Sequence, residues 1–409
     1  MIYNESKYNT SWKTEKLSDL GVFSRGISKH RPRNDPRLFT GGGYPLVQTG
    51  EIKEANLFIT SHTQEYGEFG LQQSRLWDAG TLCITIAANI AETAILSYPM
   101  CFPDSVVGFQ ANKAVSSELF MYYVFDYIRT AIQGAATGSA QDNINIDYLT
   151  SLEFKIPSKE YQDKIVGIVG SLDRMILKNE QINDNLEATI QAAFDKAFHD
   201  AGVNLPETII KQNKVPQGWT DATVGDFASV QTGPFGSQLH NEDYVESGTP
   251  IITVEHMDGK YIAHRNLPLV SQNDVDRLRK YDLHTGDIVF SRVGSVDRAV
   301  MVSQHEDGWL FSGRCLRVRP YDPNTGSYFL WWFNQPVIRQ LVTASAVGAT
   351  MPSINTSILN SIRIVFPQKD IVTQFCKMAD GLIEIIATNL EEIRKLNDAR
   401  EYIQLSLSR

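Results

Sequence analysis

The sequence contains an internal repeat, and this feature constrains the fold more than any other. Gly138 and Gly348 open two similar stretches, Pro157 and Pro367 close them, and the members of both pairs are 210 residues apart. A long segment with heptad-like apolar spacing follows each proline. A chain that repeats a globular module and a long helix builds a pseudo-twofold object from one polypeptide, which suits a partner made of two parts.

Each module has the same order of sequence signals. A glycine followed by β-rich residues, at Gly80 and at Gly286, predicts a turn and then a strand. Helix-like stretches at 118–132 and 327–341 carry aromatic clusters, which we interpret as core residues rather than as platforms for base stacking. A glycine-rich loop and a last strand follow in each copy. Several strands with one helix per module predict an α+β fold.

The two long segments predict helices that pair with each other. The expected seam follows alternating three- and four-residue steps. Its positions are Ile165, Ile168, Leu172, Met175, Ile182, Leu186 and Ala193 in the first segment and Phe375, Met378, Leu382, Ile385, Leu396 and Ile403 in the second. Because a whole module precedes each helix, we expect an antiparallel coiled coil that separates two globular domains.

One polar position on the expected seam is repeated. Asn179 and Asn389 are also 210 residues apart. A buried asparagine pair costs stability but can fix the register of two helices. We expect the two side chains to meet at the pseudo-dyad, and the alternative is that each one faces solvent or a partner subunit.

These signals give the expected domain boundaries. Residues 1–157 form the first globular domain, 158–200 the first long helix, 201–216 a linker, 217–367 the second globular domain and 368–409 the second long helix. The segment 201–216 is assigned as the linker because it carries Gly202, Pro206 and Pro216 and few aromatic residues.

Composition and motifs exclude several classes of protein. The net charge of −9 argues against a surface that coats nucleic acid everywhere, but it leaves room for local basic patches. The four cysteines are far apart, which predicts reduced thiols rather than a zinc site or disulfides. No apolar run reaches the roughly 18 residues that span a bilayer, so we expect a soluble cytoplasmic protein. We expect no catalytic residue and no bound metal, because phosphate-loop, metalloprotease, nucleophile-elbow and methyltransferase motifs are missing and Glu51–Lys53 alone is a weak nuclease signal.

Polar and basic loops occur at related places in the two copies, in a pattern typical of nucleic-acid contacts. The first copy has a basic run at 25–37 and the second an amide-rich loop at 231–240. The candidate DNA-binding residues are Arg25, Lys29, Arg31, Arg33, Asn89, Ser139, Gln141, Asn143, Gln231, Ser237, Gln238, His240, Arg292, Ser295, Arg298, Arg314, Thr350 and Ser353. Solvated turns of similar composition are common and are the alternative interpretation.

The sequence resembles the specificity (S) subunits of type I restriction–modification systems. The resemblance covers almost the whole chain and rests on the order and duplication of the stretches 137–144 with 154–157 and 348–354 with 364–367, together with 232–237. It implies two target-recognition domains that bind the two parts of a bipartite site in double-stranded DNA. A helix of about 40 residues is about 60 Å long, against about 34 Å for one turn of DNA, so the helices would act as a ruler between the two parts.

The resemblance also implies partners that carry the chemistry. The chain would be a non-catalytic subunit that binds no cofactor itself. Two methyltransferase (modification) subunits would bring S-adenosylmethionine and flip the target adenine. Up to two restriction subunits would bring ATP with Mg²⁺. Two alternatives remain: a recognition subunit of a related system in which one partner chain both methylates and cleaves, and a coiled-coil scaffold that binds proteins but not DNA.

Overall fold

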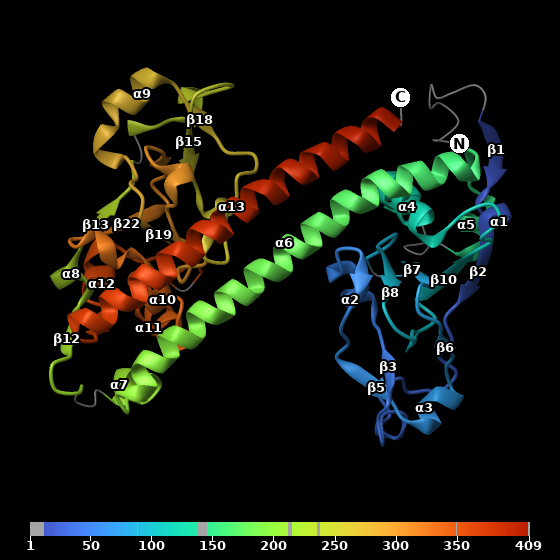
Figure 1. Ribbon diagram of the computed structural model, residues 1–409, viewed down its shortest axis with the longest axis horizontal. Helices are drawn as coiled ribbons and strands as arrows, with labels where there is room; N and C mark the ends of the chain where they lie inside the picture. Colours follow the sequence, from blue (N-terminus) through green and yellow to red (C-terminus); the bar gives the residue numbers. More distant parts are fainter. Residues whose placement is uncertain are drawn as a thin grey trace. The chain divides into compact units, whose positions relative to one another are not determined.

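The computed structural model describes residues 12–87, 89–137, 145–211, 215–234, 238–348 and 350–407. Its internal contacts divide the chain into two compact units (Figure 1). The first unit comprises Met1–Lys178 with Lys395–Arg409, and the second comprises Asn179–Arg394. Each unit therefore holds one globular module and parts of two long helices, α6 (Lys159–Asp200) and α13 (Lys369–Leu407).

The module of the first unit is built on two sheets. A five-stranded sheet has the order β2 (Gly21–Arg25), β10 (Val106–Ala111), β7 (Leu82–Thr85), β8 (Thr93–Leu96) and β4 (Phe58–Ile59). A four-stranded sheet has the order β5 (Gln64–Tyr66), β3 (Tyr44–Leu46), β9 (Met100–Cys101) and β6 (Leu76–Trp77). β1 (Lys13–Lys16) pairs with β11 (Glu153–Ile156). The helices are α1 (Leu17–Leu20), the 3-10 helix η1 (Pro36–Leu38), α2 (Thr49–Glu54), α3 (Glu68–Gln72), α4 (Glu118–Thr137) and α5 (Ile146–Ser151).

The module of the second unit repeats this plan. One four-stranded sheet has the order β13 (Ala228–Thr232), β22 (Cys315–Pro320), β19 (Ile288–Ser291) and β20 (Ala299–Met301). Another has the order β14 (Tyr244–Val245), β18 (Leu269–Val270), β15 (Thr249–Ile252) and β21 (Leu310–Phe311). β12 (Thr220–Thr223) pairs with β23 (Arg363–Phe366), and β16 (Met257–Asp258) with β17 (Tyr261–Ile262).

Short helices connect these strands. They are α7 (Leu205–Lys211), α8 (Val224–Phe227), η3 (Asn241–Asp243), η4 (Val254–His256), α9 (Gln272–Arg277), η5 (Arg279–Tyr281), η6 (Gln304–Glu306), η7 (Pro323–Thr325), α10 (Gly326–Phe333), α11 (Pro336–Ser345) and α12 (Thr356–Asn360). The segment expected to be a linker contains α7, whose Leu205 and Ile209 are buried in the core of the second unit.

The repeated topology confirms the expected α+β fold. The strand order β2–β10–β7–β8 in the first unit matches β13–β22–β19–β20 in the second. The aromatic clusters are core residues, as the sequence predicts: Tyr122 and Tyr123 of α4 are 6% exposed, and Trp331 and Trp332 of α10 are fully buried. Burial of such large rings against the sheet provides much of the hydrophobic stabilisation of a module this size.

The buried face of the long helices differs from the expected seam. On α6 it follows Gln162, Val169, Ile176, Asn183 and Ile190, each seven residues from the next and less than 10% exposed. This face is rotated by about a quarter turn from the expected seam, of which Ile168, Met175 and Ile182 are exposed. The prediction was wrong for these three positions and for Ile385, but Ile165 and Phe375 are buried as expected. Leu186, Ala193 and Leu382 also pack against a hydrophobic core. Polar residues interrupt the buried line, so counting apolar residues selects part of the flank as well.

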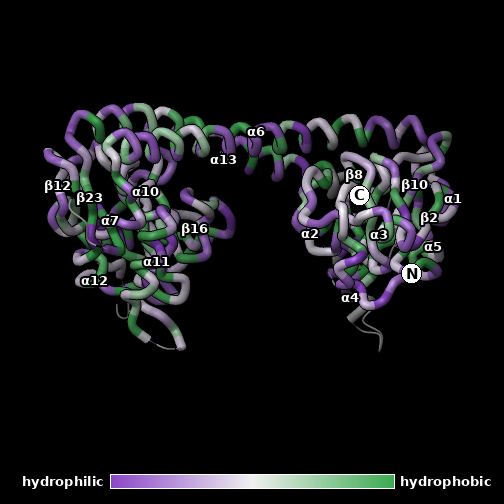
Figure 2. Tube along the Cα trace, turned by 90° about the horizontal axis from the view of Figure 1, so that it is seen from below, coloured by the Kyte–Doolittle hydropathy of each residue, from purple (hydrophilic) through white to green (hydrophobic). Residues whose placement is uncertain are grey.

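The two helices pair in antiparallel fashion, as expected. In the first unit Arg400 of α13 bonds Asp173 of α6, and in the second unit Asn389 of α13 bonds Asn183 of α6. As the residue number falls along α13 it rises along α6, which only an antiparallel pair allows. Figure 2 shows the alternation of hydrophilic and hydrophobic residues along α6. No helix among the described residues is long and apolar enough to cross a membrane.

The expected contact between Asn179 and Asn389 is replaced by a neighbouring one. Asn389 Nδ2 donates to Asn183 Oδ1 at 2.8 Å, and the buried Asn179 Nδ2 has no hydrogen-bond partner among the described residues. The helix register is shifted by about one turn from the register that equal repeat positions would give. One turn back along α6, the same register brings Asn179 opposite Ile393, which offers no acceptor.

Candidate nucleic-acid interface

The second unit gathers most of its candidate residues at one end of the sheet β13–β22–β19–β20. The turn after β19 and the segment 347–354 are joined by backbone hydrogen bonds: Gly294 N donates to Pro352 O at 2.9 Å and Ile354 N to Arg292 O at 3.0 Å. Arg292 N donates to Arg314 O at 2.9 Å, just before β22 begins. The residues brought together in this way are Arg292, Ser295, Arg298, Arg314, Thr350 and Ser353.

This loop cluster is positively charged where it faces solvent. Arg298 and Arg314 are exposed, and their side chains have no hydrogen bond or ion pair with the described part of the chain. The nearest acid in sequence, Asp297, is occupied by Arg339, whose Nε and Nη2 lie 2.9 and 2.6 Å from Asp297 Oδ2. Exposed arginines on a braced loop are suited to phosphate oxygens and to guanine edges.

A buried hydroxyl holds the turn after β19. Ser291, the last residue of β19, is fully buried; its Oγ donates to Ser295 O and accepts from Arg298 N at 3.1 Å. In the first unit Thr85, the last residue of β7, does the same: its Oγ1 donates to Asn89 O and accepts from Glu92 N at 3.0 Å. The two modules therefore share one turn architecture.

The residues that this shared turn exposes are different. Asn89 stands where the second unit has Ser295, and Glu92 stands where it has Arg298. Glu92 lies 3.4 Å from Arg129, whereas Arg298 is exposed. Thr85 and Ser291 are not among the residues predicted from the sequence. Both strands that follow a glycine end in a hydroxyl residue, and this shared feature could have identified them.

The basic loop of the first unit lies at the same end of its sheet as the Asn89 turn. On β10, Val107 is the register partner of Arg25 and Val106 that of Thr85, so both loops leave the sheet side by side. The second unit has the same arrangement. On β22, Leu316 is the register partner of Thr232 and Cys315 that of Ser291.

Carboxylates hold part of this basic loop in place. Asp104 accepts from Arg31 at 3.2 Å and from Arg33 at 2.5 Å, and its carbonyl accepts from Arg25. Asp35 binds Arg37 and His30, and the Arg37 hydrogen bonds hold the pKa of Asp35 far below its usual range. Lys29 is exposed. The loop keeps a positive excess, but its arginines are less available than the sequence alone indicates.

The amide candidates of the second unit are already engaged within the chain. Gln231 Oε1 accepts from Arg317 at 2.6 Å, and Gln238 Oε1 accepts from Tyr281 at 2.6 Å. A glutamine that reads adenine needs both its carbonyl and its amide nitrogen. His240 caps η3 through its backbone, donating to Asp243. Gln231 and Gln238 thus stabilise the module, and each already uses its carbonyl oxygen for a contact within the chain.

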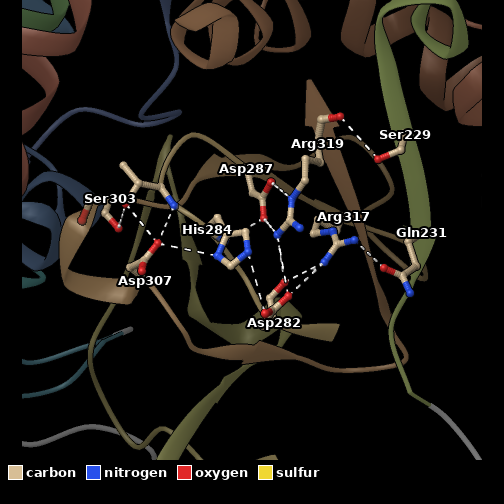
Figure 3. Close-up of polar contacts among 10 residues, drawn as sticks. Ser229, Gln231, Asp282, His284, Asp287, Ser303, Asp307, Arg317 and Arg319 are labelled. Atoms are coloured by element: carbon tan, nitrogen blue, oxygen red, sulfur yellow. Dashed lines mark hydrogen bonds and ion pairs between the residues drawn. The ribbon is translucent and has the colours of Figure 1, made fainter. Parts of the chain in front are cut away.

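Figure 3 shows the polar cluster around Gln231. Arg317 Nη1 donates to Asp282 O at 2.6 Å, and Arg319 binds both carboxylate oxygens of Asp287, at 2.7 and 2.6 Å. Burial lowers the pKa of Arg317, whereas the Asp287 hydrogen bond raises that of Arg319. Both arginines brace β22 through these contacts; Arg317 is buried, and the side chain of Arg319 is 29% exposed. Ser139, Gln141, Asn143 and Ser237 lie outside the described residues.

A second candidate surface follows the exposed side of α6. Tyr161, Ile168, Met175 and Ile182 are each seven residues apart and 42, 55, 46 and 37% exposed. The repeat places Ile371, Met378 and Ile385 at three of the four equivalent positions of α13, and Glu392 is at the fourth. Ile385 is 47% exposed, and Ile371 and Met378 are partly exposed. An apolar heptad line in solvent is typical of a helix face that receives a partner helix.

Comparisons with known proteins identify the family. Residues 9–188 and 216–395 each match the family described as the type I restriction modification DNA specificity domain. The type I restriction enzyme MjaIX specificity subunit of Methanocaldococcus jannaschii is 21% identical over 97% of this chain and 92% of its own length. The type I restriction enzyme HindI specificity subunit of Haemophilus influenzae is 24% identical over 96% of this chain and 98% of its own length.

A solved structure shares the fold. The crystal structure of a type I restriction–modification S subunit from M. genitalium covers 98% of this chain and 97% of its own, with a TM-score of 0.66 and 14% sequence identity. The two family matches fall on the two copies of the repeat and together include most of the chain. The chain therefore belongs to the family of type I restriction–modification DNA specificity subunits.

Proposed function

We propose that this chain binds double-stranded DNA and directs adenine methylation, and restriction where a nuclease subunit is present, to a bipartite target. The observation that carries the proposal is the repeated sheet end. Both units hold a loop and a turn there in one architecture, with Thr85 and Ser291 in the same role, but expose different side chains. Two modules of one fold with different exposed residues are suited to two different half-sites.

Direct readout in this proposal belongs to the exposed members of each cluster. In the second unit these are Arg298, Arg314, Ser295 and Thr350, which combine charge for phosphates with groups that reach base edges. In the first unit, Asn89 and Lys29 are the exposed residues at the corresponding end of the sheet. Phosphate contacts by Arg25, Arg31 and Arg33 would compete with Asp104. The net charge of −9 makes such local clusters necessary, because the whole surface does not attract DNA.

Catalysis in this proposal belongs to partner subunits. Two methyltransferase subunits would dock on the exposed apolar lines of α6 and α13, one on each line, because three of the four positions of the line are apolar in both helices. They would bring S-adenosylmethionine, and up to two restriction subunits would bring ATP with Mg²⁺. No group of three His, Cys, Asp or Glu side chains suited to a metal occurs among the described residues. The complex would work in the cytoplasm.

A salt titration separates this proposal from the protein scaffold. The chain, assembled with its methyltransferase, is titrated with duplex DNA of random sequence by fluorescence anisotropy at several salt concentrations. A DNA-reading complex should lose affinity steeply as salt rises, since each phosphate contact releases counterions. Weak binding that does not depend on salt would favour a scaffold. The related system with one methylating and cleaving partner would be recognised by cleavage activity in the purified partner chain.

A further inference from the structure

The first unit contains an ionic triad at the junction of three helices, in which the carboxylate is buried and the Arg400 side chain is 32% exposed. Tyr123 of α4 donates its hydroxyl to Asp173 Oδ2 at 2.5 Å, and Arg400 of α13 donates Nη1 to Asp173 Oδ1 at 2.9 Å. Asp173, on α6, is only 4% exposed. Burial and the Asp173 hydrogen bond raise the pKa of Tyr123; for Arg400, burial lowers the pKa but the Asp173 contact outweighs it. Arg400 and Asp173 form an ion pair, and the Tyr123 hydroxyl binds the second carboxylate oxygen.

The second unit has three apolar residues at the equivalent positions. Phe333, Ile383 and Ile190 are each 210 residues from Tyr123, Asp173 and Arg400. They belong to one hydrophobic cluster and are 0, 2 and 0% exposed. The exchange is complete: a junction that is ionic in one copy of the repeat is entirely apolar in the other.

Stability alone does not explain the ionic version. A buried ion pair generally adds no more stability than well-packed apolar residues of similar size, and the second unit shows that this fold accepts the apolar version. Removing one partner of such a pair is costly, because the other charge is then buried without compensation. A triad of this kind therefore discriminates strongly between the correct partner and an incorrect one.

The incorrect partner is a second copy of the chain. Since α6 and α13 are related by the repeat, α6 of one copy could pair with α6 of another, and α13 with α13. In the observed antiparallel register, a pair of α6 helices would set Ile190 of one copy against Asp173 of the other. A pair of α13 helices would set Arg400 against Ile383 and Phe333. The first arrangement leaves the buried Asp173 without its cation, and the second leaves the partly exposed Arg400 without its carboxylate.

The asparagines do not make this distinction. The observed pairing forms a bond between Asn183 and Asn389 and leaves Asn179 opposite Ile393. In a pair of α6 helices the same register sets Asn183 of one copy against Asn179 of the other, and in a pair of α13 helices it sets Asn389 against Ile393. The number of asparagine pairs per two chains is unchanged, so selectivity must come from elsewhere.

We propose that Tyr123, Asp173 and Arg400 are a pairing determinant, which makes α6 pair with α13 of the chain and rejects a second copy bound through like helices. Only the first unit needs the ionic version. It places one charged residue on α6 and one on α13, so both a pair of α6 helices and a pair of α13 helices contain a mismatch. The inference rests on the repeat and the helix register, and it holds whether or not the chain reads DNA.

The test exchanges two residues of the full-length chain. The variant I190R/R400I moves the arginine from α13 to α6 and keeps the overall composition. Pairing of α6 with α13 is now mismatched at both junctions, whereas like pairs satisfy both: Asp173 meets the arginine introduced at position 190, and Ile383 meets the isoleucine introduced at position 400. We expect light scattering to give two-chain particles, with a dimer dissociation constant about 100-fold or more below that of the wild type.

Two further variants keep the test decisive. Adding D173I and I383D to the exchange moves the whole ion pair to the second unit, and this variant should return to the wild-type mass. If I190R/R400I does not fold, the all-apolar variant Y123F/D173I/R400I decides, because it should form two-chain particles at a lower protein concentration than the wild type does. The proposal is overturned if the exchange variant keeps the wild-type mass and melting temperature, or if the all-apolar variant dimerises no more than the wild type over a concentration series, since tethering alone would then account for the pairing.

Discussion

At the scale of single residues, the buried hydroxyls of Thr85 and Ser291 connect the fold to the binding surface. Each hydroxyl donates to a backbone carbonyl and accepts from a backbone amide of the turn that follows its strand. Without the hydroxyl these backbone groups would lose two hydrogen bonds, each of which contributes about 0.5–1.5 kcal/mol. The exposed residues of the turn are therefore held in place by a side chain that does not itself reach the surface.

Paired substitutions at Thr85 separate the hydroxyl from the methyl group. Thr85→Val keeps the volume and removes the hydrogen bonds, so we expect a loss of about 1–3 kcal/mol in unfolding free energy. Thr85→Ser keeps the hydroxyl and loses one methyl group, for which about 1 kcal/mol is expected. Urea unfolding monitored by circular dichroism measures both. Equal stability of the valine variant and the wild type would show that the hydroxyl does not support the turn.

The exposed arginines should contribute directly to DNA binding. Arg314→Ala, in the complex with the methyltransferase, should weaken binding of target DNA by about 1–3 kcal/mol if the side chain meets a base, or lower the salt slope by about one if it meets a phosphate. The matched control is Lys196→Ala, an exposed cation of α6 paired with Asp200. Unchanged affinity and slope for Arg314→Ala would remove it from the interface.

The four cysteines give a prediction about pH. All four are buried, and burial raises the pKa of Cys101 and Cys376 to about 11 and of Cys315 to about 12. The unfolded thiols ionise near pH 9 while the folded ones keep their protons, so stability is complete below pH 9 and falls as the pH rises towards 11–12. Iodoacetamide at pH 8 should label the native chain far more slowly than the urea-unfolded chain; rapid native labelling would contradict the buried thiols.

At the scale of secondary-structure elements, the long helices carry two separate faces. The face through Val169 and Ile176 is buried, and the line through Ile168 and Met175 is exposed. Apolar spacing predicted the helices, and the module before each helix predicted their antiparallel pairing, but the spacing did not separate the two faces. Gln162 shows why: it is 1% exposed, and its Nε2 donates to Val115 O and Pro157 O, so a polar residue sits on the buried line. No hydrophobic pattern contains that information.

The exposed line should be required for partner binding and not for folding. The double variant I168D/M175D places charges in the proposed docking face and should abolish co-purification with the methyltransferase, with little change in melting temperature. The control Q181D/N185D adds the same charge at exposed positions on another face of α6. Loss of binding in both variants would show that added negative charge on α6 prevents binding wherever it is placed. Normal binding of I168D/M175D would show that the methyltransferase does not dock on this face.

At the scale of the whole molecule, the repeat explains both what the sequence predicts and what it leaves open. The duplicated glycines, prolines and strands are consequences of one fold used twice, so the architecture could be read from their spacing. The loops differ between copies, and their polar residues also serve the chain itself: Gln231 holds Arg317, and Asp104 holds Arg31. Which polar residues remain exposed depends on contacts between distant segments, which the sequence does not display.

The most direct test of the central claim is base-resolution mapping of adenine methylation in cells that express this chain with its methyltransferase. We expect a bipartite motif that disappears when the chain is removed. We also expect Arg298→Ala with Arg314→Ala to relax one part of the motif and preserve the other, because only the second unit is altered. A methylation pattern that does not depend on the chain, with expression of the methyltransferase confirmed, would contradict its role in reading DNA.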